Sequence, residues 1–144
     1  MAKLLLVEDE DNLRELVGCR LEQSGYQVVT AADGYEAVKQ ARTCHPDLVI
    51  LDLMIPKMDG YTVCRLLRSS GYSDTPIILF SARSGPDDVR RGMDMGASAY
   101  VTKPFEPEVL LGKIEELLRA AEEQKHPKAA APKPLPTASA GNPA

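Results

Sequence analysis

Three stretches of the chain are apolar without alternation: 4–7, 48–51 and 77–80. Uninterrupted apolar runs of this length are typical of strands that are buried on both faces, as in a parallel sheet. Two further segments, 27–31 and 97–101, are less uniformly apolar but also contain strand-forming residues. The pattern therefore predicts five short strands.

Apolar residues at helical spacing follow each predicted strand, and Gly25, Gly71 and Gly96 are expected to end three of the helices. Asp33 and Glu36 resemble a capping box, and Ser84 is expected to cap a helix with Pro86 in its first turn. Strand and helix alternate five times with short connections. This order predicts an α/β domain, a parallel sheet with helices on both faces, joined by right-handed crossovers.

The length of 144 residues suits one domain, which we place at residues 1–123. Residues 124–144 are rich in Pro, Ala and Lys, and we expect a disordered tail or a linker to a missing domain. No apolar run approaches the ~20 residues of a membrane span. The three cysteines are scattered and are expected to be reduced thiols. Together these features predict a cytoplasmic protein without a membrane partner.

The acidic charge is concentrated in the predicted domain. Residues 1–124 hold 14 basic and 21 acidic residues, a net charge of −7. This balance disfavours nonspecific binding to nucleic acid, because such affinity comes from neutralising phosphates. We therefore expect no direct nucleic-acid partner, and a surface suited to cations or basic partners.

Polar side chains follow four of the five predicted strands at the carboxyl end. Glu8 and Asp9 follow the first strand, Asp52 ends the third, Ser81 the fourth, and Lys103 follows the fifth. In open α/β sheets, ligands bind at this edge, where the strand order reverses. We expect these side chains to meet there.

Three carboxylates at one edge repel each other unless a cation lies between them. Oxygen ligands in this number suit a hard divalent ion, and we expect Mg²⁺. Lys103 adds a cation and Ser81 a hydroxyl, which completes the set of groups needed to handle a phosphoryl group. Pro104 is a candidate for a cis peptide bond that aims the Lys103 ammonium inward.

The motifs at these positions resemble the receiver (CheY-like) domain of two-component response regulators. The matching segments span nearly all of residues 3–120: Val7-Glu8-Asp9-Glu10, Asp52-Leu53-Met54-Ile55-Pro56-Lys57-Met58-Asp59-Gly60, Ser81-Ala82 and Tyr100-Val101-Thr102-Lys103-Pro104-Phe105. The resemblance implies a flavodoxin-like three-layer sandwich with strand order 2-1-3-4-5.

The resemblance also implies a phosphorylation switch. Asp52 would accept a phosphoryl group from a sensor histidine kinase or a histidine phosphotransfer protein, and Lys103 and Ser81 would contact that group. Mg²⁺ would be held by Asp9, Asp52 and the backbone carbonyl of Met54, with Glu8 acting mainly through water. Ser81 and Tyr100 would form the switch.

Family members pass this signal to a surface made by the fourth helix, the fifth strand and the fifth helix, which here would control a downstream protein target. Members that dimerise through this surface and bind DNA commonly have an Asp-Asp pair where this chain has Ser98-Ala99. We therefore expect a monomer or a weak phosphorylation-dependent dimer. A stand-alone receiver is the preferred interpretation, and the alternative is part of a larger regulator whose output domain is absent.

Three other functions fit less well. An aspartate-nucleophile phosphohydrolase needs a general acid two residues after the nucleophile, where this chain has Met54. We therefore expect no enzyme activity beyond self-phosphorylation and slow dephosphorylation, slowed further by bulky Met54 and Arg83. A degenerate receiver would lack the acceptor, an acid or the lysine. A nucleotide- or flavin-binding protein would have a Gly-rich or Ser/Thr-rich loop in place of the acids after the first strand.

Overall fold

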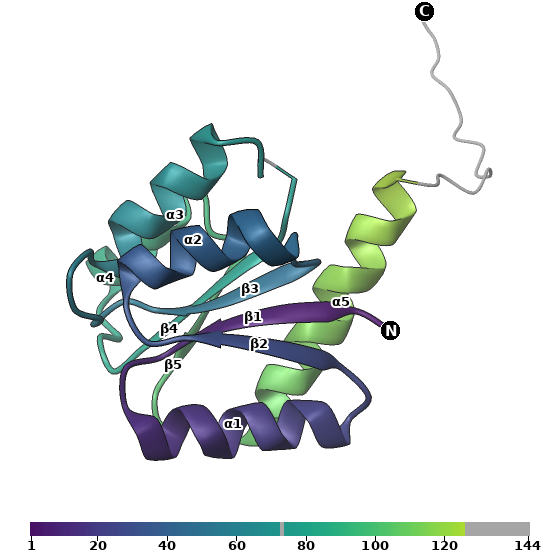
Figure 1. The fold of residues 1–144 in the computed structure, drawn as a ribbon. Coiled ribbons are helices and arrows are strands. Elements are labelled where there is room, and N and C mark those ends of the chain that lie inside the picture. Colours follow the sequence, from purple (N-terminus) through teal and green to yellow (C-terminus); the bar gives the residue numbers. More distant parts are fainter. Residues whose placement is uncertain (73, 126–144) are drawn as a thin grey trace, which may run out of the picture.

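The computed structural model describes residues 1–72 and 74–125 and contains one parallel five-stranded sheet of order β2-β1-β3-β4-β5 (Figure 1). This order confirms the flavodoxin-like fold expected from the sequence. The strands are β1 (Lys3–Val7), β2 (Gln27–Ala31), β3 (Leu48–Asp52), β4 (Ile77–Ser81) and β5 (Ala99–Thr102). The helices are α1 (Asp11–Gln23), α2 (Gly34–Cys44), α3 (Gly60–Ser69), α4 (Pro86–Asp94) and α5 (Pro107–Lys125).

The sheet separates two apolar cores. Alternate residues of a strand point to opposite faces, so Leu5 and Val7 pack with α2 and α3, whereas Leu4 and Leu6 pack with α1 and α5. Figure 1 shows the helices on both sides of the sheet. The central strands β3 and β4 are buried along their whole length, which explains why their sequences do not alternate.

The strand register aligns the carboxyl ends of the four strands that carry candidate site residues, β1, β3, β4 and β5. Val7 of β1 lies opposite Leu51 of β3, and Asp52 lies opposite Phe80 of β4. Ser81 lies opposite Thr102 of β5. The residues that end or follow these strands are therefore brought to one edge.

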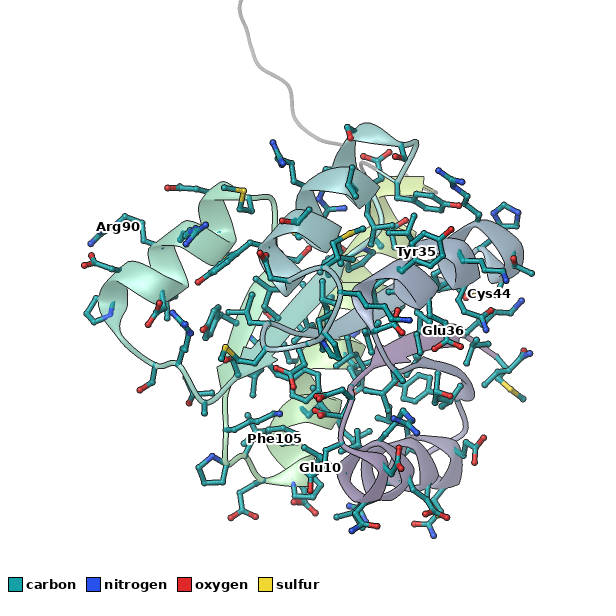
Figure 2. The ribbon with its side chains drawn as sticks, turned by 60° about the vertical axis from the view of Figure 1, so that its left-hand side comes forward. Glu10, Tyr35, Glu36, Cys44, Arg90 and Phe105 are labelled. Carbon is teal, nitrogen blue, oxygen red and sulfur yellow. The ribbon has the colours of Figure 1, made fainter. Side chains whose placement is uncertain are left out.

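The capping box of α2 is confirmed. Asp33 Oδ1 accepts a hydrogen bond from the Glu36 N–H at 2.8 Å, and Glu36 Oε1 accepts one from the Ala32 N–H at 2.8 Å. Figure 2 labels Glu36 near the start of this helix. The expected cap at Ser84 is wrong, because the N-cap residue of α4 is Gly85 and the helix starts at Pro86. Proline suits that first position, since its fixed φ is already helical.

The end of the described chain differs slightly from the expected domain boundary. Helix α5 continues to Lys125, two residues into the segment expected to be a tail. Residues 126–144 lie outside the described residues. Within the described part of the chain, no helix has the length and apolar character needed to cross a membrane. The cysteines lie on α1, α2 and α3 and form no disulfide with one another.

Candidate functional site

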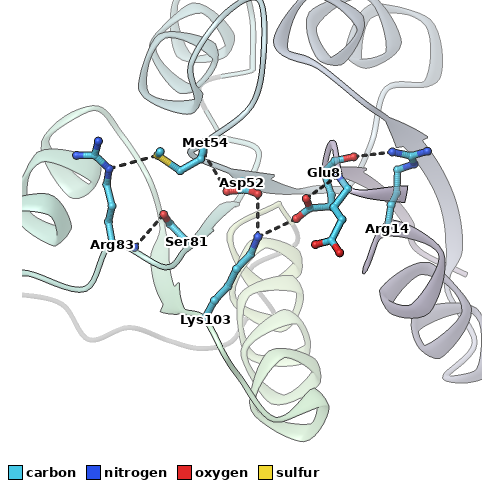
Figure 3. A network of polar contacts seen from close by, with 8 residues as sticks. Glu8, Arg14, Asp52, Met54, Ser81, Arg83 and Lys103 are labelled. Carbon is cyan, nitrogen blue, oxygen red and sulfur yellow. Dashed lines mark hydrogen bonds and ion pairs between the residues drawn. The ribbon is translucent and has the colours of Figure 1, made fainter. Parts of the chain in front are cut away.

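Asp52 lies at the centre of the site, at the end of β3, and only 2% of its surface is exposed. Its Oδ1 accepts a hydrogen bond from the Met54 N–H at 3.0 Å, and its Oδ2 accepts one from Lys103 Nζ at 2.9 Å (Figure 3). A buried carboxylate needs partners of this kind, because desolvation strongly disfavours the charged form. The side chain is thus held with both oxygens in fixed positions.

Glu8 is equally buried and shares the same lysine. Its Oε1 accepts a hydrogen bond from Lys103 Nζ at 2.9 Å, and its Oε2 accepts one from the Glu10 N–H at 2.9 Å. Arg14 donates to the Glu8 backbone carbonyl at 2.8 Å from the first turns of α1. The chain leaving β1 is therefore fixed at the site by its own backbone and by α1.

Lys103 joins the two carboxylates and lies 4.9 Å from the centre of the Phe80 ring. Burial of the ammonium lowers its pKa, but the hydrogen bonds and charges of Asp52 and Glu8 outweigh this effect and raise the pKa of Lys103. The Lys103 N–H donates to the Ser81 carbonyl at 2.7 Å, and the Lys103–Pro104 bond is cis, as Pro104 was expected to allow. The backbone of Lys103, directly after β5, is thus hydrogen-bonded to the end of β4, while its side chain carries the positive charge.

Glu8, Asp9 and Asp52 form the acidic cluster expected from the sequence. One carboxylate oxygen from each lies within 4.8 Å of the others. Two of these residues are buried and Asp9 is exposed, so the cluster opens to solvent on one side. Three carboxylates beside one ammonium leave an excess of negative charge, and this donor set fits a hard divalent cation. The ligand role of the Met54 carbonyl stays a prediction.

Ser81 and Tyr100 both bind the backbone of Arg83, in the connection between β4 and α4. Ser81 is fully buried, and its Oγ accepts a hydrogen bond from the Arg83 N–H at 3.1 Å. The Tyr100 hydroxyl donates to the Arg83 carbonyl at 2.6 Å, and burial raises the pKa of Tyr100. The two expected switch residues are therefore linked through one residue of this loop.

The end of β2 has a different role from the other strand ends. Asp33 caps α2 and lies 3.5 Å from Lys57 Nζ. The hydrogen bond from the Glu36 backbone lowers the pKa of Asp33, and the nearby Lys57 acts in the same direction. This carboxylate orders the loops around the site but belongs to the helix cap.

Sequence reasoning missed three residues that organise the site. Arg14 holds the Glu8 carbonyl, and Arg83, expected only as a bulky neighbour, contacts both switch residues. Gly60, identified from the sequence only as the last residue of the segment that begins at Asp52, allows α3 to start against the backbone of Asp52. The Asp59-Gly60 pair could have drawn attention to this position. The close approach of the Gly60 backbone to that of Asp52 depends on the tertiary structure, so the sequence alone does not predict it.

Ser98, the first residue of the Ser98-Ala99 pair, has a structural role here. Its Oγ accepts hydrogen bonds from the Ile77 N–H at 3.1 Å and from Arg68 at 3.4 Å. Arg68 also donates to the carbonyls of Gly96, Tyr72 and Thr75 at 2.6–2.8 Å. These contacts connect α3 to the segments that precede β4 and β5.

An apolar groove of about 680 Å³ lies beside the site, between α1 and the start of α5. Leu16 and Phe105 are among its lining residues, and Arg20 pairs with Glu108 at 2.9 Å between the two helices. Of the charged site residues, only Lys103 borders it. The chemistry described above therefore lies at the edge of the groove and not inside it.

Comparison with known proteins agrees with this geometry. Residues 4–115 match the family described as "Response regulator receiver domain". The chain is 48% identical over 120 residues to "Probable transcriptional regulator ycf27" of Cyanophora paradoxa, which covers 83% of this chain and 49% of that protein. It is 41% identical over 120 residues to "DNA-binding dual master transcriptional regulator RpaA" of Synechocystis, with 83% and 50% covered.

A solved structure has the same fold. The chemotaxis protein CheY4 of Vibrio cholerae superposes with a TM-score of 0.77 at 36% identity, covering 81% of this chain and 98% of that one. By contrast, the chain spans about half the length of the curated relatives it matches. Those relatives are named transcriptional regulators, and one is named DNA-binding, so the comparisons do not support the expected absence of a nucleic-acid partner.

Proposed function

Since this chain belongs to the response regulator receiver family, with residues 4–115 forming the receiver domain, we propose that it is phosphorylated on Asp52. The observation that carries the proposal is the placement of the Asp52 carboxylate. It is buried among the acidic cluster, bonded to Lys103 at 2.9 Å, and adjacent to the hydroxyl-bearing end of β4. No other carboxylate of the described residues combines these neighbours.

In the proposed reaction, an Asp52 oxygen attacks the phosphorus of a phosphohistidine or of a small donor such as acetyl phosphate. The new O–P bond forms as the P–N or P–O bond of the donor breaks, and the donor leaves with the electron pair. Lys103 is poised to neutralise charge on the phosphoryl oxygens, since its ammonium already contacts the acceptor carboxylate. Ser81 would supply a hydroxyl to the same group.

Mg²⁺ is the proposed cofactor, held by Asp9 and Asp52 with the Met54 carbonyl, and by Glu8 through water. When bound, this ion neutralises the phosphoryl oxygens and those of the acceptor. The acidic cluster supports it, because Glu8, Asp9 and Asp52 bring oxygen ligands within 4.8 Å of one another. Lys103 would remain beside them as the second positive charge.

The proposed partners are a histidine kinase or a histidine phosphotransfer protein upstream, and an output target downstream. The named relatives favour the alternative in which the receiver is part of a longer transcriptional regulator. A nucleic-acid partner is then proposed for the longer protein and not for the acidic receiver. We also propose a cytoplasmic location, which fits a receiver domain and scattered cysteines that form no disulfide.

We propose no turnover enzyme activity. Water could attack the phosphorus of phospho-Asp52, giving inorganic phosphate and the free carboxylate, but the thioether of Met54, two residues after the acceptor, cannot accept the proton that the attacking water loses. The exposed Met54 side chain also bonds with Arg83 over this part of the site (Figure 3). Slow self-dephosphorylation follows.

The test is incubation with Mg²⁺ and acetyl phosphate or phosphoramidate, followed by intact-mass measurement. We expect a gain of one phosphoryl group that is lost in Asp52→Asn and after chelation of the metal. Asp94→Asn, an exposed carboxylate at the end of α4, is the matched control and should be phosphorylated normally. A wild-type protein that gains no mass, or an Asp52→Asn protein that gains it unchanged, would refute the proposal.

A further inference from the structure

Arg83 contacts four residues on different sides of the acceptor site. Its N–H donates to Ser81 Oγ at 3.1 Å and its carbonyl accepts from the Tyr100 hydroxyl at 2.6 Å. Its side chain donates from Nε to Met54 Sδ at 3.3 Å and lies 3.5 Å from Asp88 of α4. One residue thus connects the vicinity of Asp52 with the switch residues and with α4.

The two side-chain contacts of Arg83 are weak. A thioether sulfur is a poor acceptor. The ion pair with Asp88 is long, at 3.5 Å, and 52% of the Arg83 side chain and 31% of the Asp88 side chain are exposed, so solvent screens it and it contributes little. The guanidinium is therefore held near the site by contacts that a stronger acceptor can replace.

A phosphoryl group on Asp52 would be such an acceptor. Met54 contacts both Asp52 and Arg83: its N–H donates to Asp52 Oδ1, and its sulfur accepts from Arg83 Nε. Figure 3 shows the Arg83 side chain extending past Ser81 toward Met54, on the other side of Asp52 from Glu8. Guanidinium groups bind phosphoryl oxygens with short, charge-assisted hydrogen bonds.

We propose that Arg83 is a second cationic side chain of the phosphoryl site, in addition to Lys103, and that it couples the site to α4. This inference rests on the proposed phosphorylation of Asp52. Once Asp52 is phosphorylated, the Arg83 guanidinium leaves Met54 Sδ and Asp88 and binds a phosphoryl oxygen. The ligand class is a phosphoryl group, and no bond other than hydrogen bonds and ion pairs changes in this step.

The consequence falls on the start of α4. Asp88 lies in its first turn and loses a cation, while the Asp88 carbonyl accepts a hydrogen bond from the Tyr61 hydroxyl at 3.1 Å. Arg91 of the same helix lies 4.3 Å from the centre of the Tyr61 ring. Movement of Arg83 also carries the carbonyl that Tyr100 binds. The loop and α4 are therefore expected to respond together.

The test compares wild type, Arg83→Ala, Asp88→Asn and the double variant after phosphorylation with phosphoramidate and Mg²⁺. Two quantities are measured: the half-life of the phosphorylated form by intact mass, and amide hydrogen exchange over residues 86–94 with and without phosphorylation. Arg90→Ala is the matched control, because Arg90 lies on α4 and pairs only with Asp87 among the ion pairs seen there (Figure 2). Arg83→Lys, which retains a cation, is the conservative variant.

We expect Arg83→Ala to be phosphorylated but to shorten the half-life about three- to tenfold and to lose the change in exchange over α4. Asp88→Asn removes an ion-pair partner that Arg83 would otherwise have to leave. It should therefore lengthen the half-life of the phosphorylated form when Arg83 is present, and have no effect when Arg83 is replaced by Ala in the double variant. Arg83→Lys should restore part of the half-life, and Arg90→Ala should match wild type. These four results support the proposal.

Other results overturn it. If Arg83→Ala keeps the wild-type half-life and the phosphorylation-dependent change in hydrogen exchange over α4, Arg83 only stabilises the packing of the β4–α4 connection against α4. If Asp88→Asn acts equally with and without Arg83, the exchange of partners does not occur. If wild type gains no phosphoryl group, the proposed function fails first and this inference fails with it, which separates the two failures.

Discussion

A Cβ atom at Gly60 would lie 2.7 Å from the carbonyl oxygen of Asp52, closer than carbon and oxygen can approach without displacement. Gly60 also donates its N–H to the Leu53 carbonyl at 3.0 Å, so the start of α3 is pressed against the end of β3. Glycine is needed here for close approach of two backbones. The position of Asp52, the proposed phosphoryl acceptor, therefore depends on Gly60, which has no side chain.

Gly60→Ala should destabilise the fold and displace the acceptor strand. Overpacking against backbone is expected to lower the free energy of unfolding by about 1–3 kcal/mol, measured by urea denaturation. The initial rate of phosphorylation should fall as well. Gly112→Ala is the control, since nothing lies within 4 Å of a Cβ there and it lies inside α5. Equal stability of the two variants would contradict this reading of Gly60.

Lys103→Met should leave two buried carboxylates without their cation. We expect a loss of about 2 kcal/mol in the free energy of unfolding without metal, less than for a fully buried pair because 22% of the lysine side chain is exposed. Mg²⁺ should then raise the melting temperature of the variant more than that of wild type. Lys113→Met removes an exposed pair on α5 and should change stability by no more than about 0.5 kcal/mol. An equal Mg²⁺ response in all three proteins would argue against metal binding at this cluster.

Asp33→Ala should cost about 1 kcal/mol at neutral pH by removing the cap of α2. The pKa of Asp33 is lowered in the folded protein, chiefly by the Glu36 N–H. The charged form therefore contributes stability above the unfolded-state pKa of about 3.9, and this contribution disappears as the pH falls through the lower folded value. The stability difference between wild type and variant should hold from about pH 7 to pH 5 and shrink below about pH 4. A difference that grows on acidification would show that the sign is wrong.

Arg68→Lys should destabilise the connections that precede β4 and β5. The planar guanidinium serves the carbonyls of Gly96, Tyr72 and Thr75 at once, and an ammonium cannot reproduce this fork. Because carbonyls are left without a hydrogen-bond donor, the free energy of unfolding measured by chemical denaturation should fall by about 1–3 kcal/mol. Arg65→Lys, at an exposed position of the same helix, should be nearly neutral. Similar losses in both would indicate a general effect on helix α3.

The phosphorylated protein should persist for minutes or longer, because Met54 provides no general base for an attacking water and the bulky side chains of Met54 and Arg83 lie beside the acceptor. Met54→Asp supplies a carboxylate that can accept the proton of the attacking water, and it should shorten the half-life of the phosphorylated form at least about tenfold, as followed by intact mass. Met93→Asp, an exposed methionine of α4, should leave it unchanged. A wild-type half-life of a few seconds would contradict the assignment of Met54.

The sequence by itself determined the order of elements, because uninterrupted apolar runs have one stable environment, the interior of a parallel sheet. It also determined the site, since the carboxyl ends of parallel strands meet at one edge and bring Glu8, Asp52 and Lys103 together. These inferences need only local pattern and topology. The capping box at Asp33 was predictable for the same reason, being a contact between residues three positions apart.

Only the tertiary structure decided which atoms meet across that edge. The contact of Arg83 with Met54 and the close approach of Gly60 to Asp52 depend on loop paths that no periodicity encodes. Ser84 was expected to cap α4, but the backbone before Pro86 places Gly85 there instead. Strands and helices follow from short-range pattern, whereas loop contacts depend on many weak interactions between residues distant in sequence. That is why Asp52 was identified from the sequence and its link to α4 through Arg83 was not.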